Sequence, residues 1–168
     1  INFYLKGCNN TISILESLEV DDSFHSRFSA RKRTYFYRIL NRKSPSPLLI
    51  NRTWFIPYSL DVYDMLEASK YLIGKHDFNS FRSSQCQAKN SIRSLDEINI
   101  LRKEDEIHFS LSARSFLHNQ VRIIVGSLVN IGRKYWKKDK IKEILAQKLR
   151  ASAGPTAPPH GLYLKKIS

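Results

Sequence analysis

The sequence predicts an α/β (α+β) fold, in which a mostly antiparallel sheet carries helices packed on one of its faces. The segment RKRTYFYRIL at 31–40 has the alternation and composition of a strand. The segments 92–101 and 106–112 are typical of two paired strands around the polar turn KEDE at 103–106. In 113–131 the apolar residues recur in steps of three and four, which indicates a helix. With 168 residues, 42% of them hydrophobic, the chain is long enough for one domain with a true core.

Before these elements, the loose alternation of ISILESLEV predicts a strand at 12–20, followed by a turn at 21–23. In the strand 31–40, Tyr35, Tyr37 and Ile39 share one face, and Thr34, Phe36, Arg38 and Leu40 share the other. Aromatic side chains flanked by basic ones suit the stacking of RNA bases. Two tyrosines packed in the core of a sheet explain the same spacing.

The remaining elements follow from breakers and periodicity. Three prolines predict a loop over most of 41–59, and the apolar spacing predicts helices at 60–73 and 138–149. The stretch 74–93 is polar, and its Arg82, Lys89 and Arg93 are available to phosphate groups. A loop rich in proline and glycine covers 151–161, and 162–167 closes the chain as a short strand.

The charge is strongly positive and unevenly distributed. The net charge is +13; residues 31–60 carry seven basic and no acidic side chains, and residues 114–168 carry twelve basic and two acidic ones. Such a field attracts a polyanion, and nucleic acid is the partner that it favours. An anionic membrane fits the charge as well, but no basic amphipathic helix with an aromatic face is present. A merely soluble basic surface is the remaining alternative.

Several other classes of protein lack support. No apolar run is long enough to span a membrane, and the first residues do not have the pattern of a signal peptide. Cys8 and Cys86 are predicted to be free thiols in a reducing cytosol, so we expect a cytoplasmic protein. The five histidines lack ligand spacing, and neither a P-loop nor a dinucleotide fingerprint occurs, so we expect no metal and no cofactor. Because the first residue is not Met, we expect the chain to begin inside a longer protein.

Arg122 is the most informative charge in the predicted helix 113–131. It lies beside the apolar face, directly after Val121 and two residues before Ile124. A guanidinium is costly to bury without a partner, so a buried Arg122 would need an acidic residue or an anionic ligand. An arginine that extends from the edge of the helix into solvent is the equally acceptable alternative.

Four segments, in this order and spacing, resemble the successive motifs of the TruA family of tRNA pseudouridine synthases. They are FHSRFSARKRTYFYRIL (24–40), GKHDFNSFR (74–82), SFLHNQVRIIVGSL (115–128) and AGPTAPPHGLYL (153–164). The resemblance covers nearly the whole chain. It implies that residues 1–168 form a single domain with the pseudouridine synthase fold. This domain would be the C-terminal half of an enzyme whose N-terminal half is absent from this chain.

The resemblance implies an isomerase that converts uridine to pseudouridine at positions 38–40 of the tRNA anticodon stem-loop, without a cofactor and as a homodimer. Tyr35 matches the active-site tyrosine that stacks on the target base, and Arg122 matches the arginine that pairs with the catalytic Asp. Leu162 matches the apolar residue packed against the target uridine, which must be flipped out of its stack. Further substrate-binding residues implied by the motifs are Arg27, Phe81, Arg82 and His118.

Two features depart from the family pattern. Where the family commonly has HHMVRN, residues 118–123 read HNQVRI, which keeps the arginine and changes its neighbours. The GRTDAGVH-like run that holds the catalytic Asp does not occur, so we expect that Asp upstream of this chain and expect the chain alone to be inactive. A non-catalytic RNA-binding module derived from the same fold is the alternative function.

Overall fold

The computed structural model describes residues 2–7, 12–26 and 28–168 and confirms the predicted fold class. The strands are β1 (Arg33–Asn41), β2 (Trp54–Ile56), β3 (Gly74–Asp77), β4 (Ile92–Lys103), β5 (Glu106–Ala113) and β6 (Leu162–Ile167). The helices are α1 (Asn2–Gly7), α2 (Val62–Ser69), α3 (Gln120–Gly132) and α4 (Lys140–Gln147). Cys8 and Arg27 lie outside the described residues, whereas Cys86 is a free thiol.

The six strands form one sheet in the order β2-β1-β5-β4-β3, in which β6 also pairs with β1. Every pairing is antiparallel except that of β1 with β2. Both β2 and β6 pair with the edge of β1 that β5 leaves free: β6 pairs with Arg33–Tyr37, and β2 with Ile39–Asn41. β1 therefore lies in the middle of the sheet, and its side chains reach both faces.

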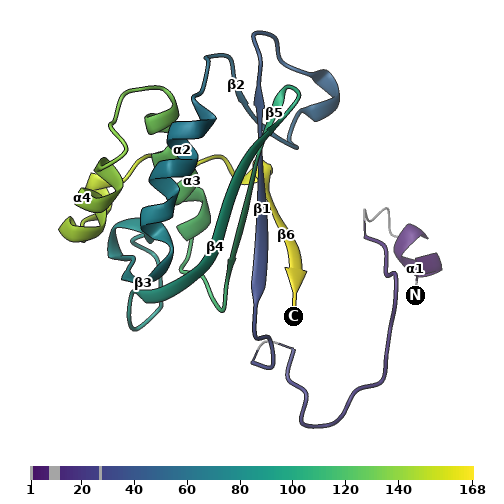
Figure 1. The fold of residues 1–168 in the computed structure, drawn as a ribbon. Helices are drawn as coiled ribbons and strands as arrows, with labels where there is room; N and C mark the ends of the chain where they lie inside the picture. The colour runs from purple at the N-terminus through teal and green to yellow at the C-terminus, as the bar shows by residue number, and fades with distance from the viewer. Residues whose placement is uncertain (1, 8–11, 27) are drawn as a thin grey trace.

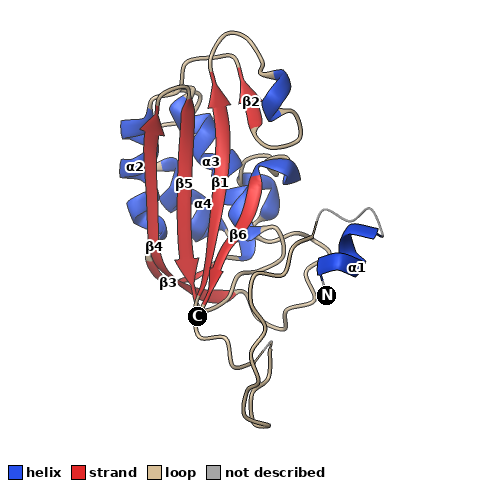
Figure 2. Cartoon of the chain, turned by 90° about the vertical axis from the view of Figure 1, so that its right-hand side faces the viewer, coloured by secondary structure: helices blue, strands red, loops and turns tan. Residues whose placement is uncertain are grey.

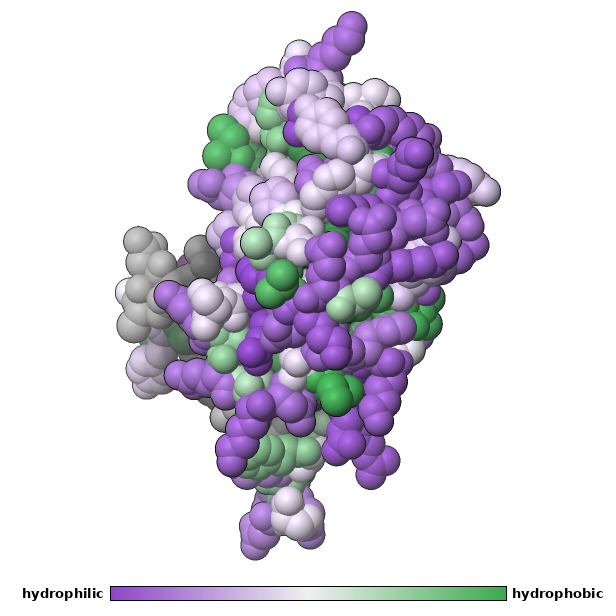
Figure 3. Space-filling view, turned by 90° about the vertical axis from the view of Figure 1, so that its left-hand side faces the viewer, coloured by the Kyte–Doolittle hydropathy of each residue, from purple (hydrophilic) through white to green (hydrophobic). Residues whose placement is uncertain are grey.

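Helices α2, α3 and α4 cover one face of the sheet (Figure 1). The core lies between these layers, where Tyr37, Ile39 and Phe109 from the sheet and Ile124 and Leu128 from α3 are all fully buried. The outer side of the helix layer is mostly hydrophilic (Figure 3). The opposite face of the sheet is covered by no helix of the described chain (Figure 2).

α3 is the central helix of this layer. Eleven of its thirteen residues are buried, as expected for a helix that packs against the sheet on one side and α2 on the other. It begins at Gln120, seven residues later than the sequence pattern predicted. Asn119, the residue before it, has a left-handed φ of 61°, which no helical turn contains. Phe116 and Leu117 matched the helical spacing because this loop also packs inwards.

The prediction of a strand at 12–20 is wrong. All nine residues are exposed and belong to no helix or strand, and Leu15 is 96% exposed. Their apolar side chains alternate too loosely to give one buried face, and no strand among the described residues pairs with them. The predicted loop 41–59 contains the short strand β2, and the polar stretch 74–93 contains the short strand β3. Both strands are too short to give a periodic pattern.

The helix predicted at 60–73 is α2 followed by a 3₁₀ turn at Lys70–Leu72. It begins after Asp61, whose carboxylate accepts a hydrogen bond from the Asp64 backbone N–H at 3.0 Å, the usual arrangement of an N-cap. The predicted hairpin is confirmed: β4 and β5 are joined at Glu104 and Asp105, and Glu104 adopts a left-handed φ of 52°. The helix predicted at 138–149 is confirmed as α4, and the strand predicted at 162–167 as β6.

Candidate active site

A pocket of about 290 Å³ lies between the N-terminal end of α3 and the ends of β1 and β6. We call it the α3 pocket. Its lining brings together four residues that the sequence motifs singled out, namely Tyr35, His118, Arg122 and Leu162. These residues come from three segments far apart in the chain, so only the pairing of β1 with β6 and the packing of α3 on the sheet bring them together.

The walls of the α3 pocket are aromatic and aliphatic. The Tyr35 ring is half-buried and makes an edge-to-face contact with Phe116, with ring centroids 5.2 Å apart. Leu162, the first residue of β6, adds a partly buried aliphatic side chain to the same lining. Flat rings and aliphatic groups arranged in this way suit a planar heterocycle such as a nucleobase.

Arg122 is half-buried and held in place by hydrogen bonds from two of its nitrogens. Its Nε donates to the Ala157 carbonyl at 2.6 Å, and its Nη1 donates to Asn119 Oδ1 at 3.0 Å. The Ala157 N–H in turn donates to the Arg122 carbonyl at 3.1 Å, so the 153–158 segment clamps the first turn of α3. Arg122 is therefore an ordered group of the pocket wall. The alternative of an arginine extending freely into solvent is wrong.

The electrostatics of the α3 pocket favour an anion. Arg122 lies in the first turn of a thirteen-residue helix, where the backbone N–H groups already carry partial positive charge. None of the residues that line the pocket is acidic, and no carboxylate of the described residues forms an ion pair with Arg122. A carboxylate entering this pocket would gain an opposite charge and would have its pKa lowered.

Arg122 also affects the pKa of Tyr37, the buried tyrosine two residues after Tyr35. Burial raises the pKa of the Tyr37 phenol far above its ordinary value, and the Arg122 charge only partly opposes this. The Tyr37 hydroxyl donates to the Pro158 carbonyl at 2.8 Å. Tyr37 is thus a protonated core residue that anchors the 153–158 segment, and Tyr35 alone presents its ring to the pocket. Of the two alternatives for this strand, packing in the core holds for Tyr37.

The structure places the other predicted site residues elsewhere. Phe81 is fully buried in the core, where it packs against Phe78, so its side chain does not reach the pocket. Arg82 lies in the following loop, where its guanidinium bonds the Ala88 carbonyl at 3.4 Å. That loop contacts the 114–119 loop through a hydrogen bond from Ser83 N–H to the His118 carbonyl. Neither Phe81 nor Arg82 therefore lines the α3 pocket.

The sequence motifs missed two contributors to the α3 pocket. The apolar spacing places Phe116 on a helix face, and Asn119 stands out in the sequence only as a departure from the family pattern. In the structure, Phe116 packs edge to face against Tyr35, and Asn119 both precedes the first residue of α3 and accepts a hydrogen bond from Arg122. The tolerance of Asn for left-handed backbone was the only signal in the sequence that could have placed the start of α3 correctly.

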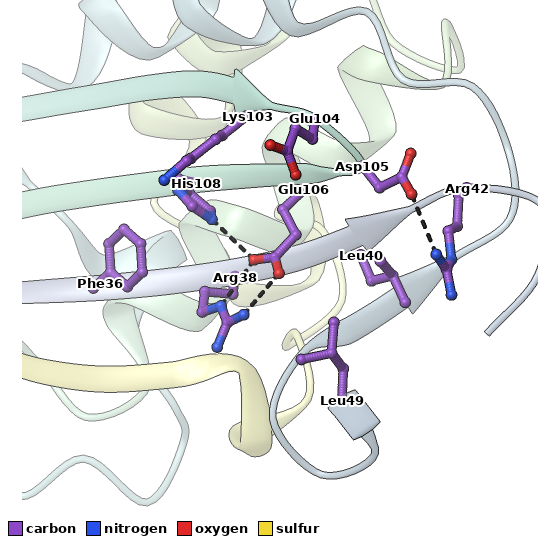
Figure 4. A pocket seen from close by; sticks show the side chains of 10 residues that line it. All are labelled: Phe36, Arg38, Leu40, Arg42, Leu49, Lys103, Glu104, Asp105, Glu106 and His108. Carbon is purple, nitrogen blue, oxygen red and sulfur yellow. Dashed lines mark hydrogen bonds and ion pairs between the residues drawn. The ribbon is translucent and has the colours of Figure 1, made fainter. Parts of the chain in front are cut away.

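A larger hollow, of about 520 Å³, lies on the uncovered face of the sheet (Figure 4). There Arg38 pairs with Glu106 through two hydrogen bonds of 2.7 and 2.8 Å, and His108 contacts the same carboxylate at 2.9 Å. The charges of Arg38 and Glu106 neutralise each other. None of the site residues that the sequence motifs predicted lines this hollow. We therefore assign the candidate active site to the α3 pocket despite its smaller volume.

Neither a metal site nor a membrane span emerges from the described residues. No three His, Cys, Asp or Glu side chains in this part of the chain lie together as metal ligands would. In the same part of the chain, no helix is long and apolar enough to cross a membrane.

Comparisons with known proteins agree with the motifs. A family model described as tRNA pseudouridine synthase matches residues 68–168. Relatives named tRNA pseudouridine synthase A, from Wolbachia pipientis wMel, Anaplasma phagocytophilum and Ehrlichia chaffeensis, are 52%, 48% and 47% identical to this chain over 167 residues. Each match covers 99% of this chain and 67% of the relative, so the chain spans about two thirds of their length. The chain belongs to the tRNA pseudouridine synthase family.

Proposed function

We propose that the chain forms the C-terminal part of an enzyme that isomerises uridine to pseudouridine at positions 38–40 of the tRNA anticodon stem-loop. The observation that carries this proposal is the α3 pocket, in which Tyr35, Leu162 and Arg122 meet although they are distant in sequence. Membership of the family supports the reaction type. We place the protein in the cytoplasm, because a reducing compartment keeps thiols such as that of Cys86 free.

In this reaction the bond from C1′ of the ribose to N1 of the base breaks, and a bond from C1′ to C5 forms. The proton on C5 is lost, and N1 gains one, so no oxidant and no cofactor is needed. The base must leave its stack and turn within the site. Tyr35 and Leu162 would hold the ring of the base between them, and the Tyr35 hydroxyl is the group of the pocket suited to assist removal of the C5 proton.

The carboxylate nucleophile is proposed to come from outside residues 1–168. Every aspartate of this chain lies away from the α3 pocket, and most are engaged with cations elsewhere: Asp61 and Asp64 with Lys134, Asp77 with Lys148, Asp105 with Arg42 and Asp139 with Lys142. Arg122, fixed by Ala157 and Asn119, would hold the incoming carboxylate ionised and oriented.

The test is kinetic and uses the complete protein. Tyr35→Ala and Arg122→Ala should each lower turnover by about 100-fold or more, since both act on the reacting groups. Release of tritium from tRNA labelled at C5 of uridine measures turnover, and filter binding measures affinity for tRNA. Affinity should change by less than threefold. Tyr63→Ala removes an exposed tyrosine of α2 and serves as the matched control.

Three outcomes would contradict the proposal. Equal losses of turnover and tRNA affinity would reduce Tyr35 and Arg122 to structural roles. A complete protein that binds tRNA but releases no tritium would instead favour the non-catalytic RNA-binding module. Residues 1–168 alone should bind tRNA and release none; measurable turnover would mean that the nucleophile lies within this chain.

We further propose a homodimer whose second copy covers the open face of the sheet. This face carries Phe36, which contacts His108 edge to face at 5.0 Å, and the Arg38–Glu106 pair (Figure 4). Rings and ion pairs of this kind on an uncovered sheet face suit an interface between protein chains. Analytical ultracentrifugation of the complete protein should give a dimer, and Phe36→Asp should shift it towards monomer. A wild-type monomer at micromolar concentration would refute this assignment.

A further inference from the structure

A second hollow lies at the other end of β1, where β1 and β4 end, and has a volume of about 470 Å³. We call it the β1-end hollow. Its wall includes Asn41, Arg42, Lys43, Tyr58 and Arg102. Tyr35 lies six residues earlier on β1, so the two sites are separated by about 20 Å along the strand. The β1-end hollow is therefore distinct from the α3 pocket.

The charge of the β1-end hollow is positive. None of its lining residues is acidic, and three are basic. Arg42 pairs with Asp105 at 3.2 Å, whereas Arg102 donates only to neutral oxygens, that of Asn41 Oδ1 at 2.8 Å and the Leu60 carbonyl at 3.3 Å. Lys43 is exposed and has no partner among the described residues. Two cations of the hollow thus lack a counter-charge from this part of the chain.

An aromatic platform adjoins these cations. Tyr58 is 57% exposed, and the Arg133 guanidinium lies over its ring at 4.5 Å from the centroid. Arg133 is itself fixed, because it lies 4.3 Å from the centroid of the Tyr135 ring and donates to the Tyr135 hydroxyl at 2.6 Å. The Tyr58 carbonyl accepts a hydrogen bond of 2.6 Å from Asn41 Nδ2. The hydrogen bond fixes the Tyr58 backbone, Arg133 covers one face of the ring, and the exposed remainder of the ring is open to a stacked base.

We propose that the β1-end hollow is a second RNA-binding site, which takes a backbone phosphate at Lys43 and Arg102 and stacks an unpaired base on Tyr58. Cations that track the backbone, combined with aromatic rings that stack bases, are the usual elements of single-stranded RNA recognition. An acidic peptide would satisfy the cations but would leave the Tyr58 platform unused. The proposal rests on the proposed function only for the identity of the RNA, a tRNA whose target uridine lies in the α3 pocket.

The test measures tRNA affinity of the complete protein across a series of salt concentrations. Tyr58→Ala should weaken binding by about 5- to 150-fold, the range that corresponds to loss of one stacked base. Lys43→Ala should reduce the slope of log affinity against log salt by about 1, since one phosphate contact is lost. Tyr58→Phe and Lys43→Arg should restore both values, because the ring and the charge remain.

Turnover separates this site from the chemistry. At saturating tRNA, Tyr58→Ala and Lys43→Ala should keep the wild-type kcat, and only KM should rise. Lys142→Ala, which removes an exposed lysine of α4 paired with Asp139, is the control for loss of charge alone and should leave affinity unchanged. Equal midpoints of thermal unfolding would show that all these variants fold.

Wild-type affinity and salt slope in both Tyr58→Ala and Lys43→Ala would overturn the proposal. Failure of the proposed function has a different signature: the wild-type protein would form no pseudouridine, while the two variants would still lose tRNA affinity.

Discussion

Gly126 allows the 153–158 segment to cross α3 closely enough to hold Arg122, so Gly126→Ala tests how the α3 pocket is built. A Cβ at this position would lie 1.9 Å from the Pro155 carbonyl oxygen. Ordinary contact begins at 3.4 Å, so the backbone of the 153–158 segment would have to retreat by about 1.5 Å. The clash is with backbone, which cannot rotate away as a side chain does.

The magnitude follows from opposing terms. Replacing a helical Gly by Ala favours the helix by about 1 kcal/mol. Overpacking costs about 1–3 kcal/mol, and the retreat weakens the two hydrogen bonds between Arg122 and Ala157, each contributing about 1 kcal/mol. The net destabilisation should be about 2 kcal/mol, or about 4–8 °C in Tm for a protein of this size class. Turnover should fall as well, because Arg122 loses its anchor.

Thermal unfolding of the complete protein and tritium release from labelled tRNA measure the two effects. Gly132→Ala is the matched control in the same helix, where the new Cβ would meet the flexible end of the Met65 side chain. It should cost less stability and leave turnover unchanged. A Gly126→Ala variant that is more stable than wild type, with full turnover, would refute the proposed role of this contact.

Three further predictions concern stability and binding. Tyr37→Phe should lower the free energy of unfolding by about 1 kcal/mol in urea, because the partly buried Pro158 carbonyl loses its donor; no change would mean that water replaces the hydroxyl. The hydrogen bond from Arg38, and to a smaller extent the one from His108, holds the pKa of Glu106 below its ordinary value of 4.5. The contribution of the Arg38–Glu106 pair to stability is therefore complete above about pH 4.5 and is lost as the pH falls through the lowered pKa. Glu106→Gln should therefore lose about 1–2 kcal/mol at pH 7 and show a flatter pH profile in acid, whereas an unchanged profile would contradict the pairing. Affinity of the complete protein for tRNA should fall at least about tenfold between 50 and 200 mM salt, and binding that is insensitive to salt would exclude the basic surface as the RNA site.

Much of the fold followed from the sequence because its main elements have strong local signals. β1 alternates, β4 and β5 flank a polar turn, and α3 and α4 have helical spacing. These local signals gave wrong predictions where contacts between distant segments determine the secondary structure. The strand predicted at 12–20 has no partner strand, and the helix predicted from 113 starts only at Gln120 because Asn119 is left-handed. β2 is a strand only because three of its residues pair with β1.

The sequence by itself determined which residues to suspect: the motif order singled out Tyr35, Arg122 and Leu162, and the charge predicted a polyanionic partner. Tertiary structure alone decided how they act. The pairing of β6 with β1 sets Leu162 opposite Tyr37, two residues from Tyr35, so that Leu162 and Tyr35 line the same pocket. Hydrogen bonds to Ala157 and Asn119 turn Arg122 from an edge residue into a fixed cation. It also separated Tyr35, which faces the pocket, from Tyr37 and Phe81, which are buried. Periodicity records which side chains face inwards, whereas a pocket depends on distances between segments that are remote in the chain.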